Sequence, residues 1–417
     1  MDLLSKRPRE LLFGKTFRLG ILTFKPALFR IIVLLAVQLL VSPGAMGQDF
    51  KIVFWNLENY FDTRDDVATA DDEFTPMGER YWSRKKFNEK RNGIAKILLL
   101  LSGGELPTLI GVAETENRYV LRQLTEATAL SLAGYGIIHR DSPDARGIDV
   151  GLLYRKERYT PITSDFIYVR LPDTTAKTRL ILYSKGVLDK LDTIHVFVNH
   201  WPSKYGSGTL SDSRRETAAG ALKIYCDSLL YRNSRANILI MGDFNETPDK
   251  SAASALAGFT NLAGNLMNRI EGKKRGRNAE EKYTEKLLGN NGKKLFGINK
   301  DEKLLSSEDG KLSNSSKGKK ALSNDKNFSD YSMVKGSIKF MGVWELIDHF
   351  LVSSNLLDTL EPIYCHPGSM EIFSHPALLE KDKGYLGVMP KRTYKGPRYN
   401  GGYSDHLPVV MTIKKVW

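Results

Sequence analysis

Apolar runs of strand length recur along the chain, and most of them end in a polar side chain. The clearest examples are residues 50–56, 108–114, 148–154, 192–200 and 238–243. Runs of this length and composition predict buried strands. Three further segments carry apolar residues at helical spacing and predict helices, at 83–101, 119–132 and 211–231. The pattern indicates a core built on sheets, and polar groups at the ends of its strands are expected to converge on one rim.

One of these strands ends in an acid and an amide. An apolar run from Ile238 leads through a glycine to Asp243 and Asn245, and Pro248 then ends the strand. On an extended backbone Asp243 and Asn245 share a face, while Phe244 points into the core. An aspartate can accept a proton from water, and a neutral asparagine can donate to an oxyanion without repelling it. A turn in which both residues cap backbone groups is the alternative.

The N-terminal residues have the form of a signal peptide. Arg30 precedes an apolar run at 31–41, and the small residues Ala45 and Gly47 follow at positions suited to signal cleavage. The run is shorter than the about 20 residues that a membrane-spanning helix needs, although a short retained anchor would have the same composition. We expect residues 1–47 to be removed, and the mature chain to be secreted or periplasmic without a stable membrane span.

The net charge of +13 is concentrated in two parts of the chain. Residues 1–47 carry a surplus of 5 positive charges and residues 269–330 a surplus of 6, which leaves only 2 for the rest. The basicity is therefore weak evidence that the core binds nucleic acid. Because residues 269–330 are rich in Lys, Asn, Ser and Gly, they predict an extended or disordered insertion. A basic arm that holds a polyanion is the functional alternative.

Cys226 and Cys365 are the only cysteines in the sequence. They could form one disulfide in an oxidising compartment, but their spacing matches no metal-binding motif. We expect both to be ordinary buried residues.

Seven short motifs lie at or near the predicted strand ends. They are 54–59 (FWNLEN), 112–117 (VAETEN), 146–150 (RGIDV), 199–203 (NHWPS), 242–245 (GDFN), 347–349 (IDH) and 404–408 (SDHLP). Each is weak alone, but together and in this order the set resembles the endonuclease/exonuclease/phosphatase family, whose fold is that of pancreatic deoxyribonuclease. The resemblance implies an α/β fold over residues 48–417, a four-layer α/β/β/α sandwich of two mixed sheets flanked by helices. It also implies a divalent-metal-dependent phosphoesterase.

The resemblance implies roles for individual residues. Asn56 and Glu114 match metal-binding positions, and Asp405 is expected to complete the site. Oxygen ligands of this kind suit Mg²⁺, with Mn²⁺ or Ca²⁺ as alternatives, and the sequence has no Cys–His cluster that would indicate zinc. Asp243 matches the residue that orients or deprotonates the attacking water, and Asn245 matches the neutral donor to the phosphoryl oxygens.

Two histidines match phosphate-facing positions. His406 corresponds to the histidine at the scissile phosphate, and Asp348 to its carboxylate partner, which would raise the histidine's pKa and favour the cation. His200 matches a second phosphate-facing histidine, for which a core histidine is the structural alternative. Arg146 and Asp149 lie in a matching segment and are candidate contacts to substrate or phosphate.

The expected protein is a secreted or periplasmic Mg²⁺-dependent phosphodiesterase. An endonuclease that hydrolyses nucleic-acid phosphodiester bonds is the preferred interpretation, so nucleic acid is the expected substrate. A phosphoesterase acting on phospholipid head groups or small phosphate esters could use the same core. A non-catalytic binding module is disfavoured, because binding alone does not need the full set of matched residues. The sequence indicates no protein partner.

Overall fold

Two mixed sheets form the core of the chain, and the first of them joins segments from opposite ends of the sequence. In the computed structural model, β1 (Phe50–Tyr60) is parallel to β2 (Leu109–Thr115) and antiparallel to β19 (Val409–Lys415). Phe50 pairs with Ile413 in this ladder. The order of the sheet is β13 (Ile363–Cys365), β19, β1, β2, β4 (Asp149–Arg155) and β3 (Tyr135–His139), and β14 (Glu371–Ile372) also pairs with β19.

The second sheet is built around another parallel pair. β7 (Asp192–His200) is parallel to β8 (Asn237–Asp243), and β12 (Asp348–Val352) is antiparallel to β8. These three strands are buried along most of their length, as their near-continuous apolar sequences require. The order of the sheet is β5 (Tyr159–Ile167), β6 (Ile181–Leu188), β7, β8, β12 and β9 (Thr260–Asn261).

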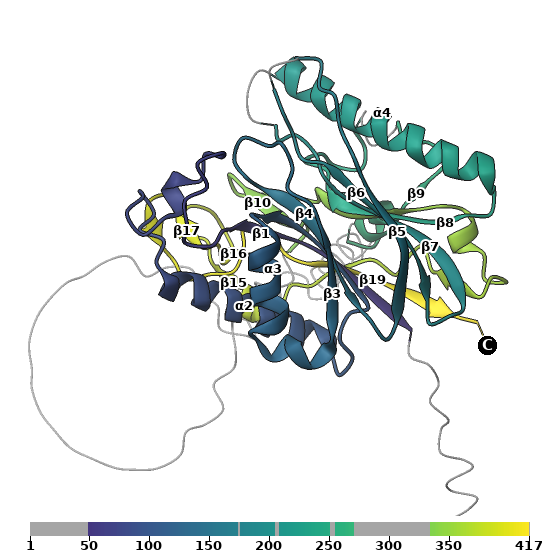
Figure 1. The fold of residues 1–417 in the computed structure, drawn as a ribbon, viewed down its shortest axis with the longest axis horizontal. Coiled ribbons are helices and arrows are strands. Elements are labelled where there is room, and N and C mark those ends of the chain that lie inside the picture. The colour runs from purple at the N-terminus through teal and green to yellow at the C-terminus, as the bar shows by residue number, and fades with distance from the viewer. Residues whose placement is uncertain (1–48, 174–175, 205–207, 251–254, 271–333, 417) are drawn as a thin grey trace, which may run out of the picture. The chain divides into compact units, whose positions relative to one another are not determined.

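Helices cover the outer faces of both sheets (Figure 1). α2 (Arg84–Ser102) begins after Ser83, whose side chain accepts a hydrogen bond from a backbone N–H of the first turn, and it ends at Gly103, which has a left-handed φ of 59°. α2 and α3 (Arg118–Glu126) pack on the first sheet, and α4 (Gly208–Arg232) packs on the second. Short 3-10 helices lie at Asp72–Phe74, Ala129–Ala133, Asn355–Leu357 and Pro376–Leu378.

The main hydrophobic core lies between the two sheets. It takes in Phe54 from β1, Val198 from β7 and Met241 from β8. Full burial of each such side chain stabilises the fold by about 1.5–3 kcal/mol. The sheets approach closely at Gly111 of β2, where a Cβ atom would lie 2.7 Å from the sulfur of Met241. The layers are therefore helices, sheet, sheet and helix, which confirms the predicted four-layer α/β/β/α sandwich.

The structure describes residues 49–416 except 174–175, 205–207, 251–254 and 271–333. The predicted signal peptide and nearly all of the predicted insertion therefore lie outside the described residues. Within the described ranges, no helix is both long enough and apolar enough to cross a bilayer.

Most predicted elements are present, with three differences. The helix expected at 119–132 is interrupted, because the side chain of Thr128 caps a new 3-10 helix by accepting the Leu130 N–H. β5 was not predicted, since five of its nine residues are exposed and polar or small residues dominate its sequence. Three small hairpins, outside both sheets, pair β10 (Ile338–Phe340) with β11 (Val343–Glu345), β15 (Leu379–Lys381) with β16 (Val388–Pro390), and β17 (Tyr394–Lys395) with β18 (Arg398–Tyr399).

The two cysteines lie in different layers of the sandwich. Cys226 lies on the buried face of α4, and Cys365 belongs to the core between the sheets. Both are buried and free, as the sequence predicted.

Candidate active site

Several of the predicted site residues lie at or near strand ends that meet at one edge of the two sheets. Asn56 lies within β1, at the point where the regular ladder with β2 is interrupted. Because β1 and β2 are parallel, Asn56 and Glu114 lie near the same end of the first sheet. β7 and β8 are also parallel, which pairs His200 with Asp243, and β12 begins at Asp348 directly opposite Asp243. The Nδ2 of Asn56 donates to Oδ2 of Asp243 at 3.0 Å. This hydrogen bond joins the two sheets at the site.

His406 reaches this edge from the loop before β19. Its Nδ1 lies 2.7 Å from Oδ2 of Asp348, and its Nε2 lies 3.8 Å from Oδ2 of Asp243. Ser404 holds the loop, because its hydroxyl donates to the Asn56 carbonyl oxygen and accepts from the His406 N–H. Burial would lower the pKa of His406, but the carboxylates of Asp348 and Asp243 outweigh it and raise the pKa well above its usual value. His406 is therefore a cation at neutral pH.

Asp243 is a buried carboxylate that titrates near neutral pH. Burial, and then the charge of Asp348, raise its pKa to about 7, although His406 and the hydrogen bond from Asn56 act in the opposite direction. A pKa near the working pH suits a general base. The preceding Gly242 permits this position, because a Cβ atom there would lie 2.6 Å from the carbonyl oxygen of Asn199 on β7.

His200 is a neutral histidine beside the same carboxylate. Its Nε2 lies 3.7 Å from Oδ2 of Asp243 and 4.0 Å from Oε1 of Glu114, distances too long for hydrogen bonds. Burial, followed by the charges of Arg179 and Arg146, lowers its pKa well below the usual value. Its Nδ1 is buried without a hydrogen-bond partner among the described residues. A buried nitrogen of this kind is costly unless a ligand or water supplies the missing partner.

Glu114 is turned toward the site by a strained backbone. Its φ of 55° is unusual for a residue with a side chain. Its Oε2 accepts the Asn59 N–H at 2.9 Å, which leaves Oε1 for a ligand. With Asn56 and Asp243 it forms a donor set that is rich in oxygen and close in space, and such a set fits a hard divalent cation such as Mg²⁺.

A second metal-binding grouping overlaps this set. Asp243, Asp348 and His406 also place one ligand atom each within 4.8 Å of one another. The hydrogen bond between His406 and Asp348 already occupies one atom of each, however, and a metal ion there would have to break it. We therefore favour the oxygen set that includes Glu114.

Asp405, the third predicted metal position, is held by a basic residue that the sequence did not indicate. Arg392 donates from Nη2 to Oδ2 of Asp405 at 2.8 Å and from Nε to Oε1 of Glu58 at 2.9 Å. The buried Lys90 donates to the carbonyl oxygen of Glu58. Burial, and then Asp405, raise the pKa of Glu58 to about 7, and burial lowers that of Lys90 to about 8. One oxygen of Asp405 is thus engaged within the protein.

Asn245 adopts the capping turn that was the alternative interpretation of this segment. The strand ends at Asp243, and Asn245 has a left-handed φ of 51°, so the expected extended backbone does not continue here. Its N–H donates to Oδ1 of Asp243 at 2.9 Å, which caps the turn, and its Nδ2 donates to the Trp201 carbonyl oxygen at 3.0 Å. Phe244 is buried in the core, as predicted.

Arg146 and Asp149, the two candidate contacts to substrate or phosphate, lie in different places. Arg146 lies at the site, because its Nη2 donates to Oδ1 of Asn59 at 2.8 Å and lies 3.8 Å from Oε2 of Glu114. Asp149 is 2% exposed, and its oxygens contact Nε2 of His139 at 3.0 Å and the N–H of Ser142 at 2.7 Å. The carboxylate of Asp149 thus orders its own loop.

A hollow of about 270 Å³ opens next to Glu58 and Asn59, which follow Asn56 in β1. Asn59, which binds the Glu114 carboxylate, and Arg392, which binds Asp405, both line it. The guanidinium of Arg80 lies over the ring of Tyr394 at 5.2 Å in the same wall. The site therefore has an adjoining space with charged and aromatic sides, sized for one ring of a substrate.

The chain belongs to the endonuclease/exonuclease/phosphatase family. The sequence pattern that defines this family matches residues 51–284 and 296–415, which cover both sheets and every residue of the site. The protein is accordingly a family member of the phosphoesterase class, a hydrolase acting on phosphate esters, and this class generally uses a divalent metal. A comparison with curated proteins gave no match.

Solved structures of several family members are similar to this chain. An endonuclease/exonuclease/phosphatase family protein from Bacteroides thetaiotaomicron is 12% identical, with 88% of this chain and 97% of that chain covered and a TM-score of 0.46. A mannosyl-6-phosphatase from the same organism is 12% identical, with 88% and 100% covered and a TM-score of 0.45. D. rerio TDP2 in complex with a single-strand DNA product is 13% identical, with 88% and 99% covered and a TM-score of 0.46.

Proposed function

We propose that this protein is a Mg²⁺-dependent phosphodiesterase that acts outside the cytoplasm as an endonuclease. The observation that supports it best is the contrast between two neighbouring groups at the strand ends. Asp243 titrates near neutral pH, whereas His406, 3.8 Å away, is held as a cation by Asp348. A base and a fixed positive charge side by side are what hydrolysis of a phosphodiester needs.

In this proposal each residue of the site has a defined task. Asp243 takes the proton of the attacking water, and Asn56 orients the carboxylate through the 3.0 Å hydrogen bond to its Oδ2. The imidazolium of His406 stabilises the charge that develops on the phosphoryl oxygens, and neutral His200 offers a further ring nitrogen beside them. A Mg²⁺ ion held by Glu114 and Asn56 would neutralise phosphate charge.

Nucleic acid is the proposed substrate because the half-exposed guanidinium of Arg146 lies 3.8 Å from Oε2 of Glu114, where it could contact a neighbouring phosphate of a polymer. A second candidate is a small phosphate ester, and one observation favours it. The 270 Å³ hollow beside Asn59 could hold a single sugar or base ring, with Arg80, Arg392 and Tyr394 as its contacts.

Nicking of supercoiled plasmid by the mature protein from Gln48 tests the proposal. We expect nicking with Mg²⁺, none with EDTA, and loss in Asp243→Asn. Asp227→Asn is the matched control, because Asp227 is half exposed on α4 and, among the described residues, forms its ion pair with Lys223 in the preceding turn. Absence of nicking by a folded, Mg²⁺-binding protein would exclude the endonuclease, and release of phosphate from sugar phosphates would then support the second candidate.

A further inference from the structure

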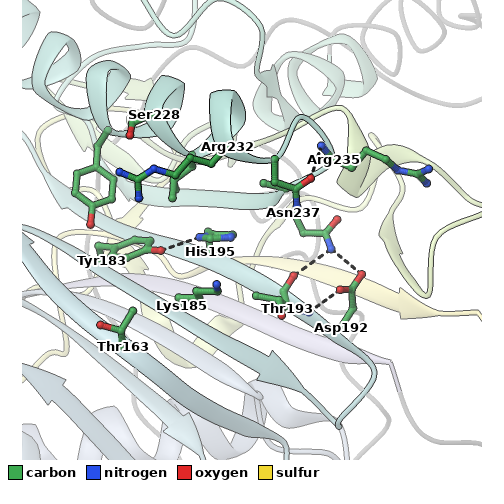
Figure 2. A pocket seen from close by; sticks show the side chains of 14 residues that line it. Thr163, Tyr183, Lys185, Asp192, Thr193, His195, Ser228, Arg232, Arg235 and Asn237 are labelled. Carbon is green, nitrogen blue, oxygen red and sulfur yellow. Dashed lines mark hydrogen bonds between the residues drawn. The ribbon is translucent and has the colours of Figure 1, made fainter.

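A second hollow lies on the outer face of the second sheet, beneath the last turns of α4 (Figure 2). Its volume is about 590 Å³, within the range of about 300–1,000 Å³ that small-molecule sites occupy. The residues that matter for its chemistry come from two strands, β6 and β7, and from α4, and they are Tyr183, Lys185, Asp192, His195, Tyr225 and Arg232.

This hollow is separate from the active site. β7 begins at the hollow with Asp192 and ends at the site with His200, and β8 likewise runs from Asn237 to Asp243. Six residues of strand, at roughly 3.3 Å each, place the two about 20 Å apart. A ligand bound in the hollow would not contact the residues that perform hydrolysis.

The chemistry of the sheet face changes where the hollow begins. Beneath the middle of α4 the outward residues are apolar, for example Phe197 on β7 and Ile240 on β8, and they pack against the helix. Further along the same strands the outward positions hold Lys185 and His195, although α4 still lies above them. A helix that merely covered the sheet would require apolar residues here.

Two of the lining cations have no counter-ion in the protein. Within the described part of the chain, neither Lys185 nor Arg232 forms an ion pair, and Figure 2 shows Arg232 extending from α4 over the floor of the hollow. The lining contains one carboxylate, Asp192, which accepts a hydrogen bond from Nδ2 of Asn237 at 2.9 Å. Arg235 differs from Arg232, since its guanidinium pairs with Glu361.

The floor between the two cations is made of neutral rings. The hydroxyl of Tyr183 and Nδ1 of His195 are hydrogen-bonded at 2.8 Å, and both residues are buried. Tyr225 adds a third ring, 4.9 Å from that of Tyr183. Burial, and then the charge of Lys185, lower the pKa of His195 to about 4, so this ring is uncharged at neutral pH. Two unpaired cations beside aromatic faces suit an anion that carries a planar ring.

We propose that this hollow is a binding site for a small phosphate ester with a planar ring, of the nucleoside monophosphate class. Lys185 and Arg232 hold the phosphate, and the half-buried ring of Tyr225, which lines the hollow, packs against the planar ring of the ligand. The inference does not depend on the proposed nuclease activity, since it uses none of the residues at the strand ends.

Titration calorimetry of the mature chain with a nucleoside monophosphate tests this proposal. EDTA is present throughout, so that no metal ion recruits the probe to the active site. We expect binding that weakens about tenfold or more in the Lys185→Gln/Arg232→Gln variant. The matched control is Arg235→Gln, which should keep the wild-type affinity, and so should His200→Ala/His406→Ala. No binding, equal affinity in the double glutamine variant, or loss only in the histidine variant would overturn the proposal.

A second measurement on the unmodified protein covers the case in which the double variant misfolds. Amine acylation followed by mass spectrometry reports the reactivity of each lysine. The nucleoside monophosphate should protect Lys185 and leave Lys96, an exposed residue of α2, at its original rate. Equal labelling of Lys185 with and without the probe would contradict the site, and inorganic phosphate in place of the probe shows whether the ring contributes.

Discussion

Asp348→Asn isolates the contribution of one charge to the site. The substitution keeps the shape of the side chain, but it removes the negative charge 2.7 Å from Nδ1 of His406. Burial acts to lower the pKa of His406. Among the carboxylates that raise this pKa, Asp348 has the largest effect. Without Asp348 the balance shifts toward burial, and we expect the pKa of His406 to fall.

The size of the effect follows from the role of the imidazolium. Loss of one preorganised electrostatic group at a transition state costs about 10²–10³ in kcat, or about 2.7–4 kcal/mol. Replacement of a buried Asp by Asn behind a catalytic histidine has cost about 10⁴ in serine proteases. We expect Asp348→Asn to lower kcat by a factor between about 10² and 10⁴, with a smaller change in KM.

The pH profile gives a sharper test than the rate alone. Hydrolysis needs protonated His406, which is populated below its pKa, so activity falls as pH rises through that value. The wild-type pKa is raised, and the alkaline fall should therefore occur at a lower pH in Asp348→Asn. Stability follows the same sign: the raised pKa of His406 stabilises the fold fully below about pH 6.5 and less as pH rises through the folded-state value.

A second buried carboxylate–histidine pair provides the control. Nε2 of His139 lies 3.0 Å from Oδ2 of Asp149, and both side chains are 2% exposed. Asp149→Asn should lower the melting temperature as Asp348→Asn does, without moving the alkaline limb of the activity profile. If the limb stays in place in Asp348→Asn, or moves equally in both variants, the assignment of His406 as the essential cation is wrong.

Three further predictions concern the base, the metal and the buried network. Asp243→Asn should lower kcat by a factor of about 10²–10⁴. It should also abolish the rise of kcat on the acid side of the pH profile, because Asp243 must lose its proton as pH rises through about 7 to act as the base. A kcat–pH profile measures both effects. Mg²⁺ at about 100 times its Kd should stabilise the fold by about 2.7 kcal/mol. Thermal unfolding measured at increasing Mg²⁺ concentration should show that the Glu114→Gln variant loses most of this stabilisation. Lys90→Ala should destabilise the fold by about 1–3 kcal/mol because it leaves the buried carbonyl oxygen of Glu58 without its donor, whereas the exposed Lys96→Ala should change stability by less than about 0.5 kcal/mol in urea unfolding.

Elements whose ends depend on neighbouring residues in the chain were predicted well from the sequence. Ser83 and Gly103 bound α2 within a residue of the expected helix, since capping and left-handed turns depend on neighbours in the chain. The apolar runs that lead to Asn56 and Asp243 were also predicted. β8 ends at Asp243 as expected, whereas β1 continues beyond Asn56 to Tyr60, past an irregularity in its ladder with β2. Their meeting at one edge follows from parallel strand pairs, which sequence pattern alone does not specify.

The rest of the site depends on contacts between distant parts of the chain. Glu58 and Arg392 are 334 residues apart, and no periodicity links them. Glu58 lies inside the motif around Asn56. It was not among the predicted site residues, because a polar residue near the end of an apolar run is ordinary. Asn245 shows the opposite case: alternation placed its side chain on the face of Asp243, but the backbone turns into a left-handed conformation there.

The position of β19 has a consequence for biosynthesis. This strand lies between β1 and β13, and its ladder with β1 joins Phe50 to Ile413. A ribosome must therefore translate past residue 413 before the first sheet can close and His406 can dock against Asp348. A nascent chain that already carries Asp243 and Glu114 still lacks the imidazolium of His406 in the site. Such late assembly, with its large cost of loop closure, would keep a nuclease inert while it is still being synthesised beside the nucleic acids of its own cell.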